Sequence, residues 1–293
     1  MRLLVGFPAG GGTDVQARLL AQQLADVLGV PAIVDNKPGA GTMIAATELA
    51  KSPADGHTLM YTPASTLTQL PQTLAAVKYD PLRDFTPVSQ CALGPVVLVM
   101  HASVPASNLR ELVDYAKKHP GRLNYVSQGI GTSAHIFGQM LGKQAGIDIV
   151  HVPYKGASDV AKDFLAGRVH LQFASSSAAA QLARSGQVKL LGVVAPRRSD
   201  LFPDLGTMSE LGIAGMDMDT SLGILGPARM TPDAVARLAD AFRSIMDMPR
   251  VREEFRTGGV EPKWAGPAEF ADTIRDSHRA WGRLLANIGY TRQ

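Results

Sequence analysis

Cysteine is almost absent from this chain of 293 residues, and Cys91 is the single one. One cysteine excludes an internal disulfide framework and a metal site built from several thiolates. Aromatic residues are also few, at 6%, yet 45% of the residues are hydrophobic and 19% are charged. This composition is typical of a globular protein with a substantial core, and it argues against wholesale disorder.

Long apolar runs and dense basic clusters are missing as well. No stretch of about 18 apolar residues occurs, so the sequence predicts no membrane-spanning helix. The net charge is only +3, from 29 Lys and Arg against 26 Asp and Glu. A charge this small, without a Lys/Arg run, argues against a nucleic-acid partner. A strand-like run begins at residue 2, and no signal peptide is recognisable before it.

Short strand-like runs alternate with helical patterns along most of the chain, which is typical of α/β layers. Strands are expected at residues 3–7, 32–34, 57–61, 96–100, 123–127, 149–153, 169–173, 188–195 and 222–225. Helices are expected at residues 14–28, 38–51, 107–119, 134–145, 158–166, 175–184, 232–246, 250–257 and 267–288. A strand, a glycine-rich loop and a helix follow one another twice, which favours two α/β domains. We expect residues 1–98 plus 224–293 in domain 1 and residues 99–223 in domain 2.

The first glycine-rich loop joins the strand at residues 3–7 to the helix at residues 14–28. Thr13 and Gln16 match a capping box, and Gly29 marks the end of the helix. A glycine loop at a helix start exposes backbone N–H groups and the positive end of the helix dipole, which together favour a bound anion. The candidate ligand-binding residues of this loop are Phe7, Pro8, Ala9, Gly10, Gly11, Gly12, Thr13 and Asp14.

The second glycine-rich loop repeats this arrangement between the strand at residues 123–127 and the helix at residues 134–145. Its candidate ligand-binding residues are Gly129, Gly131, Thr132, Ser133 and His135. Backbone N–H groups would bind the ligand, with the hydroxyl groups and the imidazole as additional donors. Two such loops facing across a cleft could hold the two ends of a dicarboxylate. The alternative is that both loops are ordinary connectors that bind nothing.

Other chemistries are supported less well. Residues 129–134 match the Gly-x-Gly-x-x-Ala fingerprint of dinucleotide-binding proteins, but that fold needs an acidic residue at the end of the next strand. Asp148 precedes that strand, and Tyr154 follows it. The first loop lacks the Lys of a P-loop, no Gly-x-Ser-x-Gly elbow occurs, and the seven His lack metal-ligand spacing. We expect no catalytic residue, metal or cofactor, and a nucleotide-dependent small-molecule enzyme remains an alternative.

Several motifs, taken in order, resemble the periplasmic receptors of tripartite tricarboxylate transporters, the TctC-like or Bug family. They are residues 7–14 (FPAGGGTD), 35–41 (DNKPGAG), 55–59 (DGHTL), 79–81 (YDP), 84–88 (DFTPV) and 151–156 (HVPYKG). The resemblance covers nearly the whole chain. It implies a type II periplasmic binding-protein fold, in which two α/β domains have a ligand cleft between them. It also implies that both glycine-rich loops hold ligand carboxylates through backbone groups and bridging waters.

The function implied by this resemblance is that of a non-catalytic extracytoplasmic solute receptor. Its ligand would be a small organic acid, a mono- or dicarboxylate, and its partners the membrane subunits of a transporter. We expect a monomer in the periplasm, in a mature form that has lost its signal peptide. A ligand-sensing partner of a signalling protein with the same fold is a further alternative.

Three more positions are expected to contribute side chains to the cleft. Ser65 and Thr66 follow the end of the third expected strand, and Tyr154 follows the strand at residues 149–153. Lys155, the next residue, is expected at the rim of the cleft or in a plain surface role.

Two expected cleft positions depart from the family pattern. Ala174 stands where the family frequently has Asp, and Ser221 stands where an aromatic residue is frequent. Loss of the carboxylate removes a partner for a ligand ammonium or hydroxyl group, and loss of the aromatic side chain widens the pocket. A typical amino-acid or citrate ligand is therefore not assumed.

Overall fold

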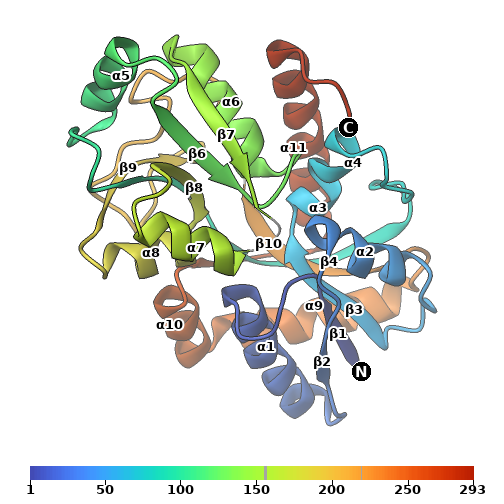
Figure 1. Cartoon of the computed structure of the whole chain (residues 1–293). Helices are drawn as coiled ribbons and strands as arrows, with labels where there is room; N and C mark the ends of the chain where they lie inside the picture. Colours follow the sequence, from blue (N-terminus) through green and yellow to red (C-terminus); the bar gives the residue numbers. More distant parts are fainter. Residues whose placement is uncertain (155–156, 219) are drawn as a thin grey trace. The chain divides into compact units, whose positions relative to one another are not determined.

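The computed structural model describes residues 1–154, 157–218 and 220–293, and Figure 1 shows the order of its helices and strands. Two compact units are present, and each contains its own sheet. Unit 1 consists of Met1–Gly94 and Thr220–Gly282, and unit 2 consists of Pro95–Asp219 and Arg283–Gln293. The prediction of two α/β domains is confirmed. The chain passes between the units after Gly94 and before Thr220, a few residues earlier than the expected 98/99 and 223/224.

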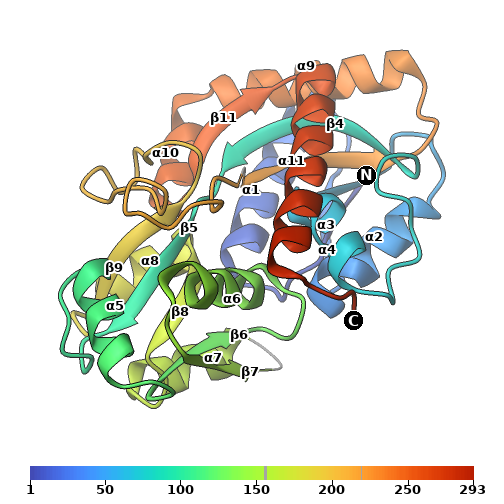
Figure 2. The same ribbon diagram turned by 90° about the horizontal axis from the view of Figure 1, so that it is seen from above.

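Unit 1 is built on a six-stranded sheet with the strand order β11-β4-β10-β3-β1-β2. Figure 2 shows β11 beside β4 at one edge of this sheet. Its strands are β1 (Arg2–Val5), β2 (Ile33–Asn36), β3 (Thr58–Pro63), β4 (Phe85–Leu93), β10 (Ser221–Pro227) and β11 (Glu261–Ala265). β1 is parallel to β2 and β3, whereas β10 is antiparallel to β3 and β4. Because β1, β2 and β3 run in parallel, the loops that follow them start at the same edge of the sheet.

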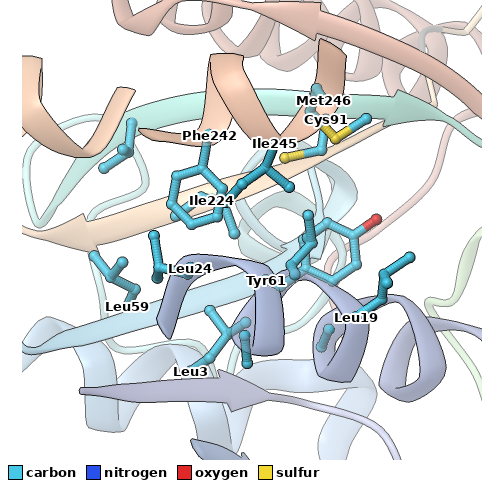
Figure 3. Packing of buried hydrophobic residues seen from close by; sticks show 14 of the residues in the cluster. Leu3, Leu19, Leu24, Leu59, Tyr61, Cys91, Ile224, Phe242, Ile245 and Met246 are labelled. Atoms are coloured by element: carbon cyan, nitrogen blue, oxygen red, sulfur yellow. The ribbon is translucent and has the colours of Figure 1, made fainter. Parts of the chain in front are cut away.

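Helices enclose both faces of this sheet. They are α1 (Gly12–Leu28), the 3-10 turn η1 (Ala40–Thr42), α2 (Met43–Ala50), α3 (Ser65–Thr68), α4 (Leu70–Thr73), α9 (Pro232–Asp247), α10 (Pro249–Thr257) and the first part of α11 (Pro267–Ile288). Leu3 of β1 lies in one core with Leu20 of α1 and Phe242 of α9, and Figure 3 shows part of this core. Leu4, on the opposite face of β1, lies in a second core with Ile274 of α11. Each such side chain, fully buried, stabilises the fold by about 1.5–3 kcal/mol.

Unit 2 is built on a five-stranded sheet with the strand order β7-β6-β8-β5-β9. Its strands are β5 (Val96–His101), β6 (Leu123–Ser127), β7 (Ile149–Pro153), β8 (Leu171–Ser175) and β9 (Val188–Val194). Its helices are α5 (Leu109–Lys118), α6 (Ser133–Ala145), α7 (Ala157–Leu165) and α8 (Ser176–Ala183). β6 is parallel to β7 and β8, so the glycine-rich loop after β6 occupies the same position in unit 2 as the loop after β1 in unit 1.

The last eleven residues, Arg283–Gln293, belong to unit 2 rather than to the domain of residues 224–293 in which we expected them. Specific contacts with α6 explain this placement. Lys143 Nζ donates a hydrogen bond to the Asn287 carbonyl oxygen at 2.7 Å. The ring of Tyr290 lies edge-on to the ring of His135, with 6.1 Å between the centroids.

The local signals at helix ends are only partly confirmed. Gly29 ends α1 in the left-handed conformation at φ 69°, as the sequence predicted. The expected capping box is wrong: α1 begins at Gly12, its N-cap is Gly11, and no side chain caps it. Gln16 accepts a hydrogen bond from the buried hydroxyl of Tyr61 instead, at 2.9 Å. Strands β4 and β11 were not expected from the sequence.

Two glycines of α6 provide a test of this packing. A Cβ at Gly138 would overlap the ring of Tyr125, whereas a Cβ at Gly142 would lie 3.3 Å from the nearest atom, the carbonyl oxygen of Ile147. We expect Gly138→Ala to lower the free energy of unfolding by about 1–3 kcal/mol through overpacking. Gly142→Ala should be near neutral, because the gain in helix propensity, about 1 kcal/mol, offsets the tight contact. Urea unfolding of both variants tests this, and equal effects would contradict it.

Candidate functional site

The first glycine-rich loop leaves the start of α1 without a side-chain cap. The first N–H groups of an α-helix have no partner inside the helix, and side chains, water or ligands satisfy them. In α1 the N-cap is Gly11, which has no side chain to accept those hydrogen bonds. Gly10 has a φ of 82°, so the left-handed conformation of the loop lies at Gly10 and not at Gly11, whose φ is −76°. Phe7, Pro8, Ala9, Gly10, Gly11, Gly12 and Thr13 are all partly or fully exposed.

Asp14 is buried and holds this loop in shape. Its Oδ2 atom accepts hydrogen bonds from the backbone N–H of Gly10 at 2.8 Å and from Arg18 Nε at 2.9 Å. Its Oδ1 atom accepts a hydrogen bond from Asn36 Nδ2 at 2.8 Å, and the same amide also donates to the Phe7 carbonyl oxygen at 3.1 Å. The structure therefore gives Asp14, a predicted ligand-binding residue, a role in positioning the loop.

The pKa of Asp14 reflects this arrangement. Burial alone raises the pKa of the carboxyl group, but the hydrogen bonds from Arg18, Gly10 and Asn36 outweigh burial, so the pKa lies below its usual value. Asp14 is therefore ionised at neutral pH. Sequence analysis did not single out Arg18 and Asn36. Arg18 was detectable as the residue four positions after Asp14 on a helix, and Asn36 as part of the 35–41 motif.

The predicted site residues after β3 differ from each other in exposure. Thr66 is buried, and its hydroxyl lies 2.7 Å from the hydroxyls of both Thr42 and Thr62. Thr42 has a φ of 89°, which is unusual for a β-branched residue and costs about 1–3 kcal/mol. The hydroxyl contacts with Thr66 therefore hold Thr42 in a strained conformation. Ser65, the first residue of α3, is partly exposed.

The second glycine-rich loop likewise leaves a helix start without a side-chain cap. Thr132 is the N-cap of α6, but its hydroxyl donates to the Gly129 carbonyl oxygen at 2.7 Å and does not cap the helix. Gly129 and Gly131 have φ angles of 122° and 81°, which side chains rarely allow. Ser133 follows as the first residue of α6 and is half-buried.

Two neighbouring histidines support this second loop. The rings of His135 and His151 lie with their centroids 4.3 Å apart, and the ring of Tyr125 stacks on His151 at 4.9 Å. His135 Nδ1 accepts the backbone N–H of Gly131 at 3.1 Å, so His135 was correctly placed at the loop but is an acceptor there. His151 Nε2 lies 2.7 Å from Ser127 Oγ.

The proton positions follow from these contacts. Ser127 Oγ donates its single proton to the Gly129 carbonyl oxygen at 2.9 Å, so His151 Nε2 must be the donor to Ser127. Burial lowers the pKa of His135, and burial together with the neighbouring His135 lowers the pKa of His151 to about 4. Both rings are therefore neutral at pH 7. His151 thus contacts the loop through Ser127, across 24 positions of the chain, and no pattern in the sequence indicated this.

The three remaining predicted positions, Tyr154, Ala174 and Ser221, make contacts outside the two glycine-rich loops. Tyr154 donates its hydroxyl to Asp163 Oδ2 at 2.7 Å and is partly exposed. Ala174 is buried in the hydrophobic core of unit 2, and Ser221 is fully buried, with its carbonyl oxygen accepting the Ala64 N–H at 2.8 Å. Lys155 lies outside the described residues.

The strand after the second loop does not complete a dinucleotide site. β6 and β7 are parallel neighbours, as such a site requires. The last residue of β7 is Pro153, whereas Asp148 lies just before the opposite end of that strand. The residue type that would hold a ribose is therefore at the wrong end of β7.

Comparison with known proteins identifies the family. A sequence model described as "Tripartite tricarboxylate transporter family receptor" matches residues 16–290. The chain belongs to this family. A curated relative, "UPF0065 protein in gbd 5'region" of Cupriavidus necator, is 33% identical over 289 residues, which cover 99% of this chain and 87% of the relative.

Several solved structures share the fold over nearly the whole chain. The periplasmic binding protein BugD is 28% identical with a TM-score of 0.89, covering 100% of this chain and 98% of its own. A Rhodopseudomonas palustris protein solved with adipate is 28% identical with a TM-score of 0.91 and the same coverage. MatC from the same species, solved with malate, is 27% identical with a TM-score of 0.85, covering 97% of this chain and 98% of MatC. The predicted type II periplasmic binding-protein fold is confirmed.

Among the helices of the described residues, none has the length and apolar character needed to cross a membrane. Within residues 1–154, 157–218 and 220–293, no group of three or more His, Cys, Asp or Glu side chains is arranged to hold a metal ion.

The role of Asp14 can be tested with Asp14→Asn. An amide would place an NH₂ group against the donors that now surround the carboxylate, so we expect a loss of about 1–3 kcal/mol in the free energy of unfolding. Asp26→Asn, on the exposed part of the same helix, is the matched control and should change little. Because the folded-state pKa is lowered, the carboxylate stabilises the fold above its unfolded pKa, and this stability is lost as pH falls through the folded pKa. Urea unfolding at pH 7 and pH 3 measures the stability loss and its dependence on pH. Equal losses of unfolding free energy in Asp14→Asn and Asp26→Asn would contradict the role of Asp14 in holding the loop.

The neutral histidine pair predicts acid sensitivity in unit 2. The folded-state pKa of His151 is about 4, below the ordinary value of 6.5, so its contribution to stability is complete above pH 6.5 and is lost as pH falls toward 4. We expect His151→Phe, which keeps an aromatic ring between Tyr125 and His135, to unfold with a weaker dependence on pH in this interval. His119→Phe, at an exposed position of unit 2, is the control. Denaturant unfolding between pH 7 and pH 4 measures this, and identical pH profiles for the wild type and His151→Phe would refute it.

Proposed function

We propose that the chain is the extracytoplasmic solute receptor of a tripartite tricarboxylate-type transporter and binds a small organic acid, a mono- or dicarboxylate. The observation that carries this proposal is that α1 and α6 both begin after glycine-rich loops without a side-chain cap. Helix α9, by contrast, is capped by the Thr231 hydroxyl, which accepts the Ala234 N–H. Side chains also cap α5 and α8, whereas α2, α3, α4 and α10 lack such a cap. What α1 and α6 share is an uncapped start that directly follows a glycine-rich loop at the end of a parallel strand.

An uncapped helix start suits a carboxylate for two reasons. Its backbone N–H groups are donors, and a hydrogen bond to a charged acceptor contributes about 1.5–3 kcal/mol. The helix dipole contributes about 0.3–1 kcal/mol more at an exposed position. A few such bonds are compatible with micromolar affinity, which corresponds to about −8 kcal/mol. The relatives solved with adipate and malate, both dicarboxylates, support the same ligand class.

The two departures from the family pattern lie at buried positions. Ala174 is part of the hydrophobic core of unit 2, and Ser221 is a fully buried serine in place of an aromatic residue. Neither supplies a carboxylate that could pair with a ligand ammonium group, and we therefore favour an organic acid without one. The proposed ligand contacts are the backbone N–H groups at the two helix starts, with Thr13 and Ser133 as side-chain donors. The Thr132 hydroxyl donates its proton to the Gly129 carbonyl oxygen and supports the loop instead.

The biological setting follows from the same proposal. The receptor would act in the periplasm as a non-catalytic monomer and would deliver its ligand to the membrane subunits of the transporter. A ligand-sensing partner of a signalling protein would bind the same class of ligand. Uptake of the bound acid by cells carrying or lacking the gene distinguishes the two roles.

The decisive variant is Gly12→Val. Gly12 is the first residue of α1, and a branched side chain there would stand beside the exposed N–H groups, so we expect carboxylate affinity to fall at least tenfold in a folded protein. Thr13→Ala removes one hydroxyl and no cap, so its effect should be smaller. A thermal-shift screen against C4–C6 mono- and dicarboxylates, with a neutral sugar and a polyamine as controls, identifies a ligand. Titration calorimetry then measures its affinity for the wild type and both variants, and circular dichroism verifies that the variants are folded.

Two outcomes would contradict the proposal. One is a folded Gly12→Val protein that binds the acid as tightly as the wild type. The other is a sugar or polyamine that binds more tightly than every acid in the panel.

A further inference from the structure

Unit 2 contains an open pocket of about 510 Å³ between α6 and the last residues of the chain. One wall is the side of α6 that carries His135, Gln139 and Lys143, which follow one another at intervals of four residues. Residues four apart lie on one face of a helix, so these three side chains form a row. The opposite wall includes Tyr290 and Thr291.

The lining of this pocket is rich in hydrogen-bond donors and carries positive charge. Lys143 Nζ donates to the Asn287 carbonyl oxygen at 2.7 Å, which fixes the ammonium group at the pocket and leaves two of its three N–H groups for other acceptors. No Asp or Glu side chain is among the lining residues. Among the side chains of the lining, none is a carboxylate that could pair with this ammonium group; Gln293, the last residue of the chain, which carries the backbone carboxyl group, also lines the pocket.

The amide of Gln139 adds a second donor. His135 Nδ1 accepts the Gly131 N–H, so a neutral ring must carry its proton on Nε2. The Nε2 atom of the Gln139 amide lies 3.2 Å from His135 Nε2. Because two N–H donors do not hydrogen-bond to each other, we interpret the amide with its oxygen and NH₂ group exchanged, so that the oxygen faces His135 and the NH₂ group is available to another acceptor.

Tyr290, which also lines the pocket, supplies the third donor. Its hydroxyl is buried and has no hydrogen-bond partner among the described residues. Leaving a buried hydroxyl without a partner costs about 1–3 kcal/mol, so such groups are rarely left without an acceptor. Burial also raises the pKa of Tyr290, so the hydroxyl keeps its proton and is available to donate.

We propose that this pocket is a second ligand site, which binds a small oxyanion, a carboxylate or a phosphate, through Lys143, the Gln139 amide and the Tyr290 hydroxyl. This site goes beyond the proposed solute receptor function, because none of these three residues belongs to either glycine-rich loop. His135 connects the two regions, since one nitrogen accepts the Gly131 N–H while the ring lines the pocket. An anion in the pocket would therefore change the surroundings of the His135 ring and, through its hydrogen bond with Gly131, those of the second loop.

The test uses the ring signals of His135 and His151, which both line the pocket. Full-length protein labelled with ¹³C at histidine Cε1 is titrated at pH 7.5 and constant ionic strength, with inorganic phosphate in one arm and succinate in the other. We expect both histidine signals to shift and saturate in at least one arm, and that arm identifies the oxyanion. Substitution of single histidines assigns the signals.

Single-residue variants test whether Lys143 and Tyr290 bind the anion. Lys143→Met should weaken the saturating anion at least tenfold, and Tyr290→Phe should weaken it several-fold. Lys118→Met, which removes an exposed charge at the end of α5, is the matched control and should leave affinity unchanged. All variants are checked for folding by circular dichroism.

Performing the same titration on Gly12→Val separates this inference from the proposed function. That variant should lose binding at the first loop while both histidine signals still respond to the anion. The inference is overturned if neither probe gives a saturable shift, or if Lys143→Met and Lys118→Met bind the anion equally well. It is also overturned if Gly12→Val abolishes the response, because the anion would then act through the first loop.

Discussion

The buried carboxylate of Asp14 is the interaction on which the first glycine-rich loop depends. A loop with three consecutive glycines has many accessible conformations, and fixing one of them costs entropy. Asp14 fixes it by accepting hydrogen bonds from Gly10 within the loop, from Arg18 one turn further along α1, and from Asn36 at the end of β2. The loop can then present the uncapped start of α1 in a single arrangement.

The second loop meets the same requirement with uncharged groups. The neutral rings of His135 and His151, with the hydroxyls of Ser127 and Thr132, hold Gly129 and Gly131 in their left-handed conformations. One loop thus depends on an ionised carboxylate and the other on unprotonated imidazoles. Both supports are intact at neutral pH, and acid weakens both, because it protonates the carboxylate and the imidazoles alike.

Most of the fold could be predicted because its signals are local. Alternating apolar runs and glycines predicted the positions of most helices and strands, and Gly29 marks the end of α1 as expected. Strands β4 and β11 were missed because β4 contains Pro87 and β11 contains Pro262 among polar residues, so neither shows a clear strand pattern. Their pairing, not their own sequence, makes them strands.

The sequence by itself determined the two glycine-rich loops, the order of the elements around them and the family, since each rests on residues close together in the chain. Only the tertiary structure decided what the individual side chains do. Asp14 meets Asn36 across 22 positions, and Thr66 meets Thr42 across 24. Tyr290 reaches α6 because the C-terminal residues pack on unit 2. Such contacts depend on how distant segments pack, and no spacing within a motif encodes them.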